Sequence, residues 1–468
     1  MAYDVIVLGS GPGGYPAAIR ASQLGFKVAI IEKESLGGVC LNWGCIPTKA
    51  LLKSAQVYEY LKHSADYGIQ SENVKHDFGA VIRRSRGVAD KMSKGVQFLM
   101  KKNKIDVVMG YGKIAGKGRV EVTAADGSKQ IVEGKYIVIA TGARSRQLPA
   151  MPIDGKKIIG YREAMVLPNQ PTSMIVVGSG AIGVEFADFY NSMGTKVTIV
   201  EFMPRIVPVE DEDISKELEK QFKKKGITIL TGSEVTAVDT TGNGVKAKIK
   251  SASGESVLEA DILLSAVGIA SNLENIGLEE TGIKTDRGRV VVDKHGQTNV
   301  PGIYAIGDCA PGQALAHVAS KEGITTAEHI GYMEKKYHHL PEAMDYNNIP
   351  GCTYCTPEVA SVGYTEKAAK EAGYEVKVGK FPFMASGKAS AAGTTEGFVK
   401  VVFDAKYGEF LGAHMIGAGV TEMIAEVVVA RKLETTHHEI LNAVHPHPTM
   451  SEALKEAVAV AYGEAIDI

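Results

Sequence analysis

Two cysteines, Cys40 and Cys45, are the residues of this sequence best suited to redox chemistry. They are the first and last residues of the run Cys-Leu-Asn-Trp-Gly-Cys, which is followed directly by Ile-Pro-Thr-Lys. Because proline favours the first positions of a helix, the sequence predicts a helix that begins near Pro47, with Cys45 close to its N-terminus. Partial positive charge at a helix N-terminus favours the thiolate, which is the reactive form of a thiol.

A disulfide between these two cysteines requires an irregular turn. On a regular helix, residues five apart have Cα atoms roughly 8 to 9 Å apart, which exceeds the ~7 Å limit for a disulfide. Asn42 and Gly44 permit such a turn. The pair therefore fits a reducible disulfide.

Two other interpretations of the pair stay open: two buried structural thiols, or half of a metal site. Cys352 and Cys355 would be the second pair of ligands for zinc. Five cysteines in the chain are too few for a secreted disulfide framework. We favour the reducible disulfide, and we expect Cys309, Cys352 and Cys355 to be packing residues and no metal to be bound.

Two segments share one local pattern, in which a strand runs into Gly-x-Gly-x-x-Gly and then into a helix. The glycines are Gly9, Gly11 and Gly14 in the first copy and Gly178, Gly180 and Gly183 in the second. An acidic residue, Glu32 or Glu201, ends a second β-rich run 23 residues after the first glycine of each copy. The glycines let the backbone approach a pyrophosphate at the helix N-terminus, and the acid binds ribose hydroxyls. The sequence therefore predicts two dinucleotide sites.

The elements that must position these residues follow from the apolar pattern. Strands are expected at 4–8, 28–32, 136–142, 174–177, 197–201, 261–268 and 302–308, and helices at 17–24, 49–62, 78–103 and 184–193. After about residue 345, strands (399–403, 409–416) alternate with helices (421–432, 451–461). The chain is thus expected to be α/β, with a separate C-terminal α+β domain.

Length and charge exclude several classes of protein. The chain has 468 residues, enough for about three domains. Its 52 Lys and Arg residues nearly balance 54 Asp and Glu residues, so no global field attracts nucleic acid or an anionic membrane. No apolar run approaches the ~18 to 20 residues that span a bilayer, and the N-terminus shows no signal or transit peptide. We expect a cytoplasmic protein.

Several motifs together carry a family resemblance. They are Gly37 to Lys49, the two glycine motifs, Ala140-Thr141-Gly142, Gly307-Asp308, and His445 to Glu452. With these motifs, the chain resembles the pyridine nucleotide-disulfide oxidoreductases over nearly its whole length. The resemblance implies FAD on the first site, NAD on the second, a homodimer, and an active site shared between subunits.

The fold implied by the resemblance is two Rossmann-like dinucleotide-binding domains plus a C-terminal α+β dimerisation domain. The expected parts are an FAD-binding domain (1–145), an NAD-binding domain (146–270), a central segment that completes the FAD side (271–345) and an interface domain (346–468).

The resemblance also implies roles for single residues. Cys40 would exchange with substrate, and Cys45 would face the flavin. Lys49 matches a lysine beside the flavin ring, and Glu185 matches its ion-pair partner. A surface helix pair of little energetic value is the alternative for those two. Further cofactor-binding candidates are Asp308, Ala316 with His317, Gly112, Thr141, Gly142, Val235 and Gly268.

Near the C-terminus, His447 matches the family's base and Glu452 the carboxylate that orients it. Attack on a disulfide requires a thiolate, and a base that titrates near neutral pH can generate one from a dithiol. An alternative for Glu452 stays open, because Thr449-x-x-Glu452 is also a capping box for the last helix. We treat His445 as structural, since the prolines on both sides of His447 make a rigid turn.

The activity implied by the resemblance is flavin-dependent oxidation of a protein-bound dihydrolipoyl group, with NAD reduced to NADH. The implied partners are lipoyl domains and the acyltransferase core of a 2-oxoacid dehydrogenase complex, or a lipoyl carrier protein of glycine cleavage. Glu201 favours NAD, because it would repel the 2′-phosphate of NADP, whereas Arg205 nearby argues the other way. Another flavoprotein disulfide reductase and a subunit that mainly binds a complex remain alternatives.

Overall fold

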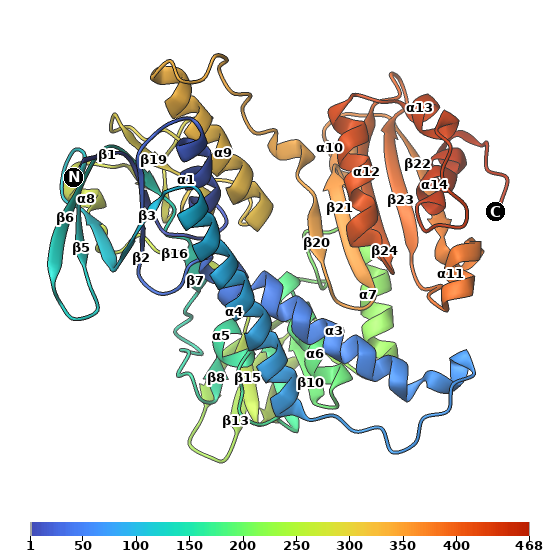
Figure 1. Cartoon of the computed structure of the whole chain (residues 1–468). Coiled ribbons are helices and arrows are strands. Elements are labelled where there is room, and N and C mark those ends of the chain that lie inside the picture. The colour runs from blue at the N-terminus through green and yellow to red at the C-terminus, as the bar shows by residue number, and fades with distance from the viewer. Residues whose placement is uncertain (1, 468) are drawn as a thin grey trace. The chain divides into compact units, whose positions relative to one another are not determined.

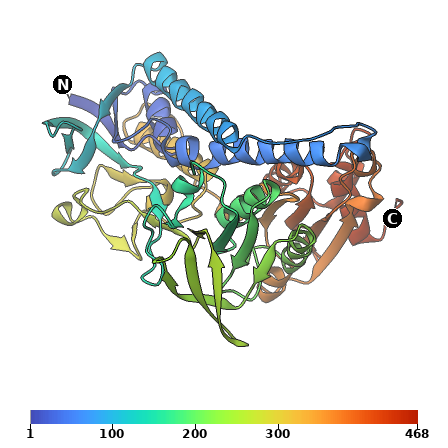
Figure 2. The same cartoon turned by 90° about the horizontal axis from the view of Figure 1, so that it is seen from below.

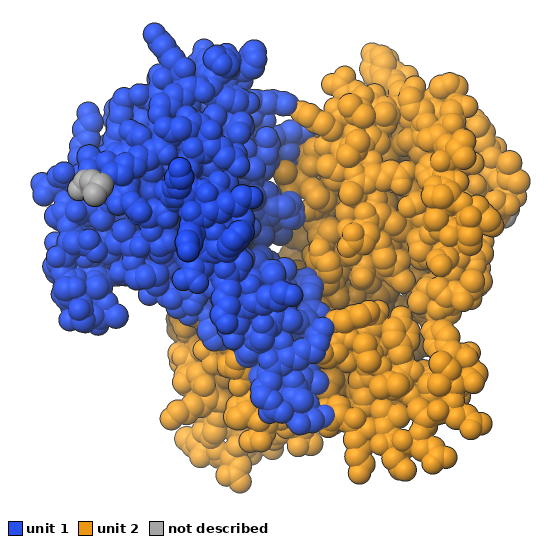
Figure 3. Space-filling view, viewed as in Figure 1, with its two compact units in different colours: residues 1–51, 77–146, 268–346 blue, residues 52–76, 147–267, 347–468 orange. Residues whose placement is uncertain are grey.

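The computed structural model describes residues 2–467, which form two compact units (Figure 3). Unit 1 holds the chain up to Leu51, Asp77–Arg146 and Gly268–Tyr346. Unit 2 holds Leu52–His76, Gln147–Val267 and the chain from Asn347 onward.

Unit 1 is built on a seven-stranded sheet in the order β3-β2-β1-β6-β5-β4, with β19 also pairing to β6. Its strands are β1 (Ala2–Leu8), β2 (Val28–Glu32), β3 (Asp106–Met109), β4 (Tyr111–Ile114), β5 (Arg119–Thr123), β6 (Lys129–Ile139) and β19 (Ile303–Ala305). Neighbours among β1, β2, β3, β6 and β19 are parallel, whereas β4 and β5 add an antiparallel edge. A parallel sheet is covered on both faces, which explains why every residue of β2 is buried.

Helices cover this sheet and carry the residues of interest in unit 1 (Figure 1). They are α1 (Gly14–Gln23), α2 (Gly38–Trp43), the start of α3 (Cys45–Lys62), α4 (Phe78–Lys102), α8 (Leu278–Thr281), η2 (Gly307–Cys309) and α9 (Ala316–Met333). Two short strand pairs complete the unit: β7 (Ala143–Ser145) with β16 (Ile269–Ser271), and β17 (Thr285–Asp286) with β18 (Arg289–Val290). α1 and α9 pack closely, because a Cβ at Gly323 would lie 2.4 Å from the Gly13 carbonyl oxygen.

Unit 2 contains a second parallel sheet in the order β11-β10-β9-β15-β8. Its strands are β8 (Ile158–Ile159), β9 (Ser173–Val177), β10 (Lys196–Val200), β11 (Thr228–Leu230) and β15 (Ile262–Ser265). A three-stranded antiparallel sheet, yellow-green in Figure 2, follows it: β12 (Ser233–Asp239), β13 (Val245–Ser251) and β14 (Gly254–Ala260). The helices of this part are α5 (Tyr161–Ala164), α6 (Ala181–Ser192) and α7 (Glu212–Lys224).

The C-terminal part of unit 2 is an antiparallel sheet in the order β20-β21-β24-β23-β22. Its strands are β20 (Gly351–Thr353), β21 (Glu358–Gly363), β22 (Val376–Pro382), β23 (Phe398–Asp404) and β24 (Phe410–Gly417). Its helices are α10 (Glu366–Glu371), α11 (Gly387–Ala392), α12 (Val420–Lys432), α13 (His437–Asn442) and α14 (Glu452–Tyr462). Short helical turns lie at η1 (Ser64–Tyr67), η3 (Tyr346–Asn348) and η4 (Phe383–Ala385). Every residue of β23 and β24 is buried, and α12 and α14 supply much of the apolar core.

The α/β fold class predicted from the sequence is confirmed, with element boundaries shifted by a few residues. One of these shifts concerns the site, where Cys45 lies at a helix N-terminus as predicted. The helix expected to begin near Pro47 begins at Cys45, so Pro47 is its third residue. Proline is tolerated there because the first four N–H groups of a helix have no partner within it. Among residues 2–467, no helix is both long and apolar enough to cross a membrane.

Candidate functional site

The helical conformation is interrupted between α2 and α3 at Gly44, whose φ of −144° and ψ of −116° are not helical. Cys40 lies in α2, and Cys45 is the first residue of α3. A Cβ at Gly44 would lie 3.1 Å from the Val39 carbonyl oxygen, so the small residue lets the chain double back. The buried Asn42 amide fixes the preceding turn by donating to two backbone carbonyls, at 3.0 and 2.9 Å. The expected irregular turn is confirmed.

This break brings the two thiols into hydrogen-bond contact. No bond joins the two sulfur atoms in this structure. The hydrogen bond to Cys45, followed by burial, raises the pKa of Cys40 well above the ordinary range, and the nearby Lys49 ammonium partly opposes that shift. Burial, and then the nearby Cys40, raise the pKa of the Tyr15 phenol in α1. The sequence motif did not point to Tyr15, although it directly follows the first glycine turn.

The long helix α4 packs directly on the redox segment. The Ser85 hydroxyl donates to the Pro47 carbonyl oxygen at 2.9 Å and is fully buried. The Arg86 guanidinium lies 4.3 Å from the ring centre of Trp43. Trp43 lies between the two cysteines, directly before Gly44. Sequence reasoning missed these contacts, because no motif joins residues 84–86 to the cysteines.

The first glycine turn has the shape that a dinucleotide requires. Gly9 has a φ of +100°, and a Cβ there would lie 2.3 Å from the Ala140 carbonyl oxygen. A Cβ at Gly14 would lie 1.9 Å from the Gly9 carbonyl oxygen, so this glycine allows close packing of helix on strand. Gly11 has only one atom near its missing Cβ, at 3.9 Å, and leaves the backbone open to a pyrophosphate. These residues fit FAD at this position.

The second glycine turn repeats the arrangement. Gly178 has a φ of +96°, and a Cβ there would lie 2.5 Å from the Ala266 carbonyl oxygen. A Cβ at Gly183 would lie 2.0 Å from the Gly178 carbonyl oxygen, whereas a Cβ at Gly180 would have no neighbour within 4 Å. The three glycines therefore divide the same roles as in the first copy and fit NAD.

Each predicted acid is buried and bound to a serine inside its glycine turn. Glu32 accepts from the Ser10 amide at 3.0 Å and from its hydroxyl at 2.6 Å. Glu201 accepts from the Ser179 amide at 2.7 Å and from its hydroxyl at 2.6 Å. Each acid also accepts from the amide two residues further on, at 2.9 and 2.7 Å. A carboxylate offers about four acceptor positions, so one remains for a ribose hydroxyl.

The remaining cofactor candidates lie at strand ends and turns. Burial raises the pKa of Asp308, although the nearby Arg289 opposes this shift. Asp308 lies in η2, and α9, the helix packed on η2, begins at the predicted Ala316. Of the others, Gly142 and Gly268 have positive φ, Val235 is buried in β12, Thr141 precedes β7, and Gly112 packs in the sheet against Leu8.

Arg205 does not extend freely from its loop. Its Nη1 lies 3.1 Å from Glu212 Oε1, and its Nη2 donates to the Pro208 carbonyl oxygen at 3.1 Å. The Arg205 guanidinium was the feature of the sequence that favoured the 2′-phosphate of NADP. It is held by its own loop and by the start of α7.

His447 and Glu452 are paired as the resemblance implied. The distance from His447 Nδ1 to Glu452 Oε1 is 2.8 Å, and the imidazole is 79% exposed. Glu452 Oε2 accepts from the Thr449 amide at 2.7 Å, yet Glu452 is the first residue of α14 and Ser451 is its N-cap. That bond from the Thr449 amide is one of the two that a capping box predicts, whereas the Thr449 hydroxyl donates to the Pro446 carbonyl oxygen at 2.8 Å, so the helix-cap alternative for Glu452 stays open. Burial acts to raise the pKa of Glu452, but the Thr449 amide and His447 outweigh it and lower the pKa.

Other candidates have structural partners. The buried Glu185 accepts from the Tyr354 amide at 2.9 Å, while Lys49 lies in the other unit, so their ion pair stays a prediction. The His445 side chain is buried, with Nε2 at 2.7 Å from Glu426 Oε1. Among the other cysteines, Cys309 and Cys355 are fully buried and Cys352 is partly buried. Within residues 2–467, no group of three or more His, Cys, Asp or Glu side chains is placed to hold a metal ion.

Comparison with known proteins identifies the family. The sequence pattern of the pyridine nucleotide-disulphide oxidoreductases matches residues 3–323, and that of the family's dimerisation domain matches residues 349–458. The chain is 51% identical to a dihydrolipoyl dehydrogenase of Rhizobium etli over 483 residues, covering 99% of each chain. It is 45% identical to that of Bacillus subtilis over 474 residues, again covering 99% of each.

Solved structures agree in fold over almost the whole chain. A crystal structure of LpdA from Mycobacterium tuberculosis matches with a TM-score of 0.90 at 27% identity, covering 97% of this chain and 99% of that one. The HOCl-induced flavoprotein disulfide reductase RclA from Escherichia coli matches with a TM-score of 0.84 at 25% identity, covering 98% of this chain and 100% of that one. On these matches, and on the cysteine pair and glycine turns described above, the chain belongs to the pyridine nucleotide-disulphide oxidoreductase family.

Proposed function

We propose that this chain oxidises protein-bound dihydrolipoyl groups to the lipoyl form and passes the electrons, through FAD, to NAD. The observation that carries the proposal is the contact between the Cys40 and Cys45 thiols at the break between α2 and α3. Curated relatives at 51% and 45% identity over 99% of this chain, which are named dihydrolipoyl dehydrogenase, support this choice of substrate.

The proposed exchange begins with Cys40 and Cys45 joined as a disulfide. One thiolate of the substrate attacks the Cys40 sulfur, which forms a mixed disulfide and releases Cys45 as a thiolate. The second substrate thiol, after losing its proton, attacks the substrate sulfur of that mixed disulfide. The lipoyl disulfide closes, and Cys40 leaves. Two electrons then reside on the cysteine pair, and the substrate has lost two protons.

The base in this proposal is His447 of the partner subunit, as the family resemblance implies. Glu452 engages Nδ1 of the same imidazole at 2.8 Å, which leaves Nε2 to accept the substrate proton. The carboxylate fixes the ring orientation and stabilises the imidazolium that forms. Glu452 is thereby a positioning residue for the base.

Both cofactor sites are proposed on the two glycine turns. Bound there, FAD would supply the two-electron chemistry that links the cysteine pair to hydride transfer to NAD. The turn at Gly11 with Glu32 would hold the FAD dinucleotide, and the turn at Gly180 with Glu201 would hold NAD. The Lys49 ammonium partly opposes the rise in the pKa of Cys40 that the hydrogen bond to Cys45 and burial cause.

The match of residues 349–458 to the family's dimerisation domain supports a homodimer. We further propose that the partner is a lipoyl domain of a 2-oxoacid dehydrogenase complex, with its acyltransferase core, or a lipoyl carrier protein, and that the protein acts in the cytoplasm.

The experiment is a turnover assay on the FAD-loaded protein with dihydrolipoamide and NAD. Cys40→Ser should lower turnover at least a thousandfold while FAD stays bound, because the serine hydroxyl cannot form the mixed disulfide. Cys352→Ser is the matched control and should keep turnover near that of the unmodified protein. Retained turnover in Cys40→Ser would exclude the proposed chemistry.

A further inference from the structure

Helix α4 has a charge unlike that of the rest of the chain. It carries seven basic residues, Arg83, Arg84, Arg86, Lys91, Lys94, Lys101 and Lys102, against one acidic residue, Asp90. The whole chain has 52 basic and 54 acidic residues. The basic excess is therefore local to this helix, which Figure 1 shows as a long blue ribbon.

Four of the seven basic residues lie on one exposed face of α4. Its buried side chains are Phe78, Ile82, Ser85, Ala89, Val96 and Met100. Residues 83, 87, 91, 94, 98 and 101 recur every three or four positions and are all exposed. At 3.6 residues per turn, they form one stripe along the helix. We call Arg83, Lys91, Lys94, Phe98 and Lys101 the basic face of α4.

The cations of this face have little compensation within the chain. Arg83 pairs with Asp77 at 3.5 Å, but the two side chains are 72% and 68% exposed. Among residues 2–467, Lys91, Lys94 and Lys101 form no ion pair. In α7, by contrast, Lys220 and Lys223 pair with glutamates of their own helix, at 3.1 and 2.6 Å. The positive field of α4 therefore extends into solvent.

Three further features of the same helix suit it to contact a protein. Phe98 lies on the basic face with 65% of its surface exposed. Gly87 and Gly95 lie within the helix, and a Cβ at either position would meet no described atom within 4 Å. Each glycine costs an exposed helix about 1 kcal/mol relative to alanine, and packing within the chain does not require either one. Small residues beside an exposed aromatic side chain let a partner's backbone approach closely.

The N-terminal half of α4 is bonded to the redox segment. Arg84 Nη1 donates to the Ala50 carbonyl oxygen at 2.7 Å, and Ser85 donates to the Pro47 carbonyl oxygen. Arg86 lies over Trp43, and its Nη1 is buried without a hydrogen-bond partner among residues 2–467. A partner bound along α4 would thus be held beside the segment that contains the cysteine pair.

We propose that the basic face of α4 is the docking surface for an acidic protein domain that carries the dithiol substrate. The inference rests on the proposed function, because that function requires a protein-bound dithiol to reach the cysteine pair. A free dihydrolipoamide molecule is uncharged and gains nothing from this field, whereas an acidic domain is attracted and oriented by it. The exposed phenylalanine and the glycines favour a protein over a nucleic acid as the occupant.

The test compares two substrates on the FAD-loaded, full-length protein. The probes are an acidic lipoylated protein domain in its reduced form and free dihydrolipoamide. In Lys91→Glu/Lys94→Glu, kcat/KM for the acidic domain should fall on the order of tenfold or more at low ionic strength. Added salt should shrink this difference, since screening weakens both attraction and repulsion. For free dihydrolipoamide, kcat/KM should stay within twofold of the unmodified protein.

A matched control and a binding measurement complete the design. Lys248→Glu/Lys250→Glu reverses the charge of two exposed lysines on β13 and should leave kcat/KM unchanged for both substrates. Complex formation with the oxidised lipoylated domain, followed by sedimentation velocity, should weaken in Lys91→Glu/Lys94→Glu and in Phe98→Ala. FAD content and circular dichroism establish that each variant is folded.

Two kinetic results would overturn the inference: an equal fall in kcat/KM for both substrates, or an unchanged kcat/KM for the acidic domain. A duplex DNA fragment that binds α4 more tightly than the lipoylated domain does would also overturn it. If the unmodified protein turns over neither substrate, the proposed function fails instead, so the two failures are distinguishable.

Discussion

Ser179 is joined to Glu201 by two hydrogen bonds, from its amide at 2.7 Å and from its hydroxyl at 2.6 Å. The Ser179 carbonyl oxygen also accepts from the Val207 amide at 3.1 Å, so one buried serine links the glycine turn, the acid and the loop that returns past them. Ser10 makes the same contacts to Glu32 and to the amide of Gly37 in the first copy. The two nucleotide turns thus share a polar anchor as well as their glycines.

This anchor leads to a pair of matched predictions. Ser179→Ala removes the hydroxyl that holds Glu201, and a lost hydrogen bond to a charged group costs about 1.5–3 kcal/mol. The KM for NAD should therefore rise about tenfold or more, while bound FAD is retained. Ser10→Ala should instead weaken the binding of FAD, with little effect on the binding of NADH. Steady-state kinetics and flavin fluorescence would measure both, and equal effects of each variant on both cofactors would contradict separate anchors.

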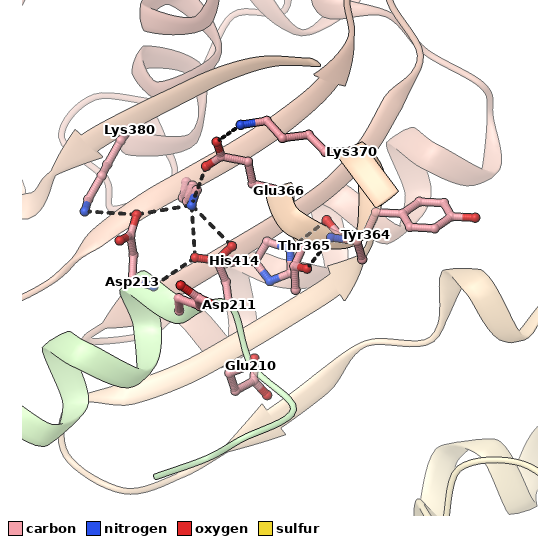
Figure 4. Close-up of polar contacts among 12 residues, drawn as sticks. Glu210, Asp211, Asp213, Tyr364, Thr365, Glu366, Lys370, Lys380 and His414 are labelled. Carbon is pink, nitrogen blue, oxygen red and sulfur yellow. Dashed lines mark hydrogen bonds and ion pairs between the residues drawn. The ribbon is translucent and has the colours of Figure 1, made fainter. Parts of the chain in front are cut away.

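A buried carboxyl group, Glu210, predicts a dependence of stability on pH. Burial raises the pKa of Glu210 from 4.5 to about 7, the neighbouring Asp211 adds to this shift, and a hydrogen bond from Ser361 opposes it. Figure 4 shows Glu210 on the loop that leads into α7. Since the folded-state pKa exceeds the unfolded value, the stabilisation is complete below pH 4.5 and is lost as the pH rises through about 7.

Glu210→Gln should remove this loss. The melting temperature of the variant minus that of the unmodified protein should increase between pH 5 and pH 8. The corresponding change in the free energy of unfolding is at most about 3 kcal/mol. Differential scanning calorimetry at the two pH values checks this. A difference in melting temperature that is the same at both would show that Glu210 does not titrate in this range.

Lys400 of β23 is a buried cation surrounded by carboxylates (Figure 4). Its Nζ lies 3.0 Å from Asp211, 3.1 Å from Asp213 and 2.9 Å from Glu366, and its side chain is 5% exposed. Removing one partner of a buried ion pair leaves uncompensated charge and costs about 3–5 kcal/mol. Lys400→Met should therefore lower the melting temperature by about 5 °C or more.

Lys380 is the matched control for this prediction. It lies 3.5 Å from Asp213, but its side chain is 46% exposed, so the pair is worth little. Lys380→Met should change the melting temperature by about a degree at most. Similar losses in the two lysine variants would mean that burial does not govern the strength of this cluster.

Gly95 gives a prediction of opposite sign. It lies inside α4, and a Cβ there would meet no atom within 4 Å. Gly95→Ala should stabilise the protein by up to about 1 kcal/mol, because alanine favours the helix and restricts the unfolded chain. Chemical denaturation monitored by circular dichroism measures the change, and a destabilised variant would reveal a contact that the open space does not suggest.

Features set by local sequence could be predicted, and features set by packing could not. The glycine turns and the spacing to Glu32 and Glu201 follow from backbone geometry within about thirty residues of chain, the length of one βαβ unit. Ser10 and Ser179 lie in those same turns, but nothing in the sequence shows that their hydroxyls point at the acids. The shared Gly-Ser-Gly of the two copies was the signal that could have found them.

The cysteine site shows the same limit. The need for an irregular turn follows from the spacing of Cys40 and Cys45, yet the break at Gly44 starts α3 two residues earlier than Pro47 indicated. The contacts of α4 with this segment join residues that are distant in sequence, and they arise only when the helix packs on the core. Local propensity cannot predict such contacts, because they depend on tertiary structure.

Differential thiol labelling tests the central claim most directly. The FAD-loaded, oxidised protein would be alkylated before and after one equivalent of NADH under anaerobic conditions, and the labelled cysteines would be located by mass spectrometry. We predict that Cys40 and Cys45 are linked and unlabelled before NADH and become labelled after it, while the buried Cys309 and Cys355 stay unlabelled throughout. Labelling of Cys40 and Cys45 to the same extent before and after NADH would contradict a disulfide that opens and closes in this enzyme.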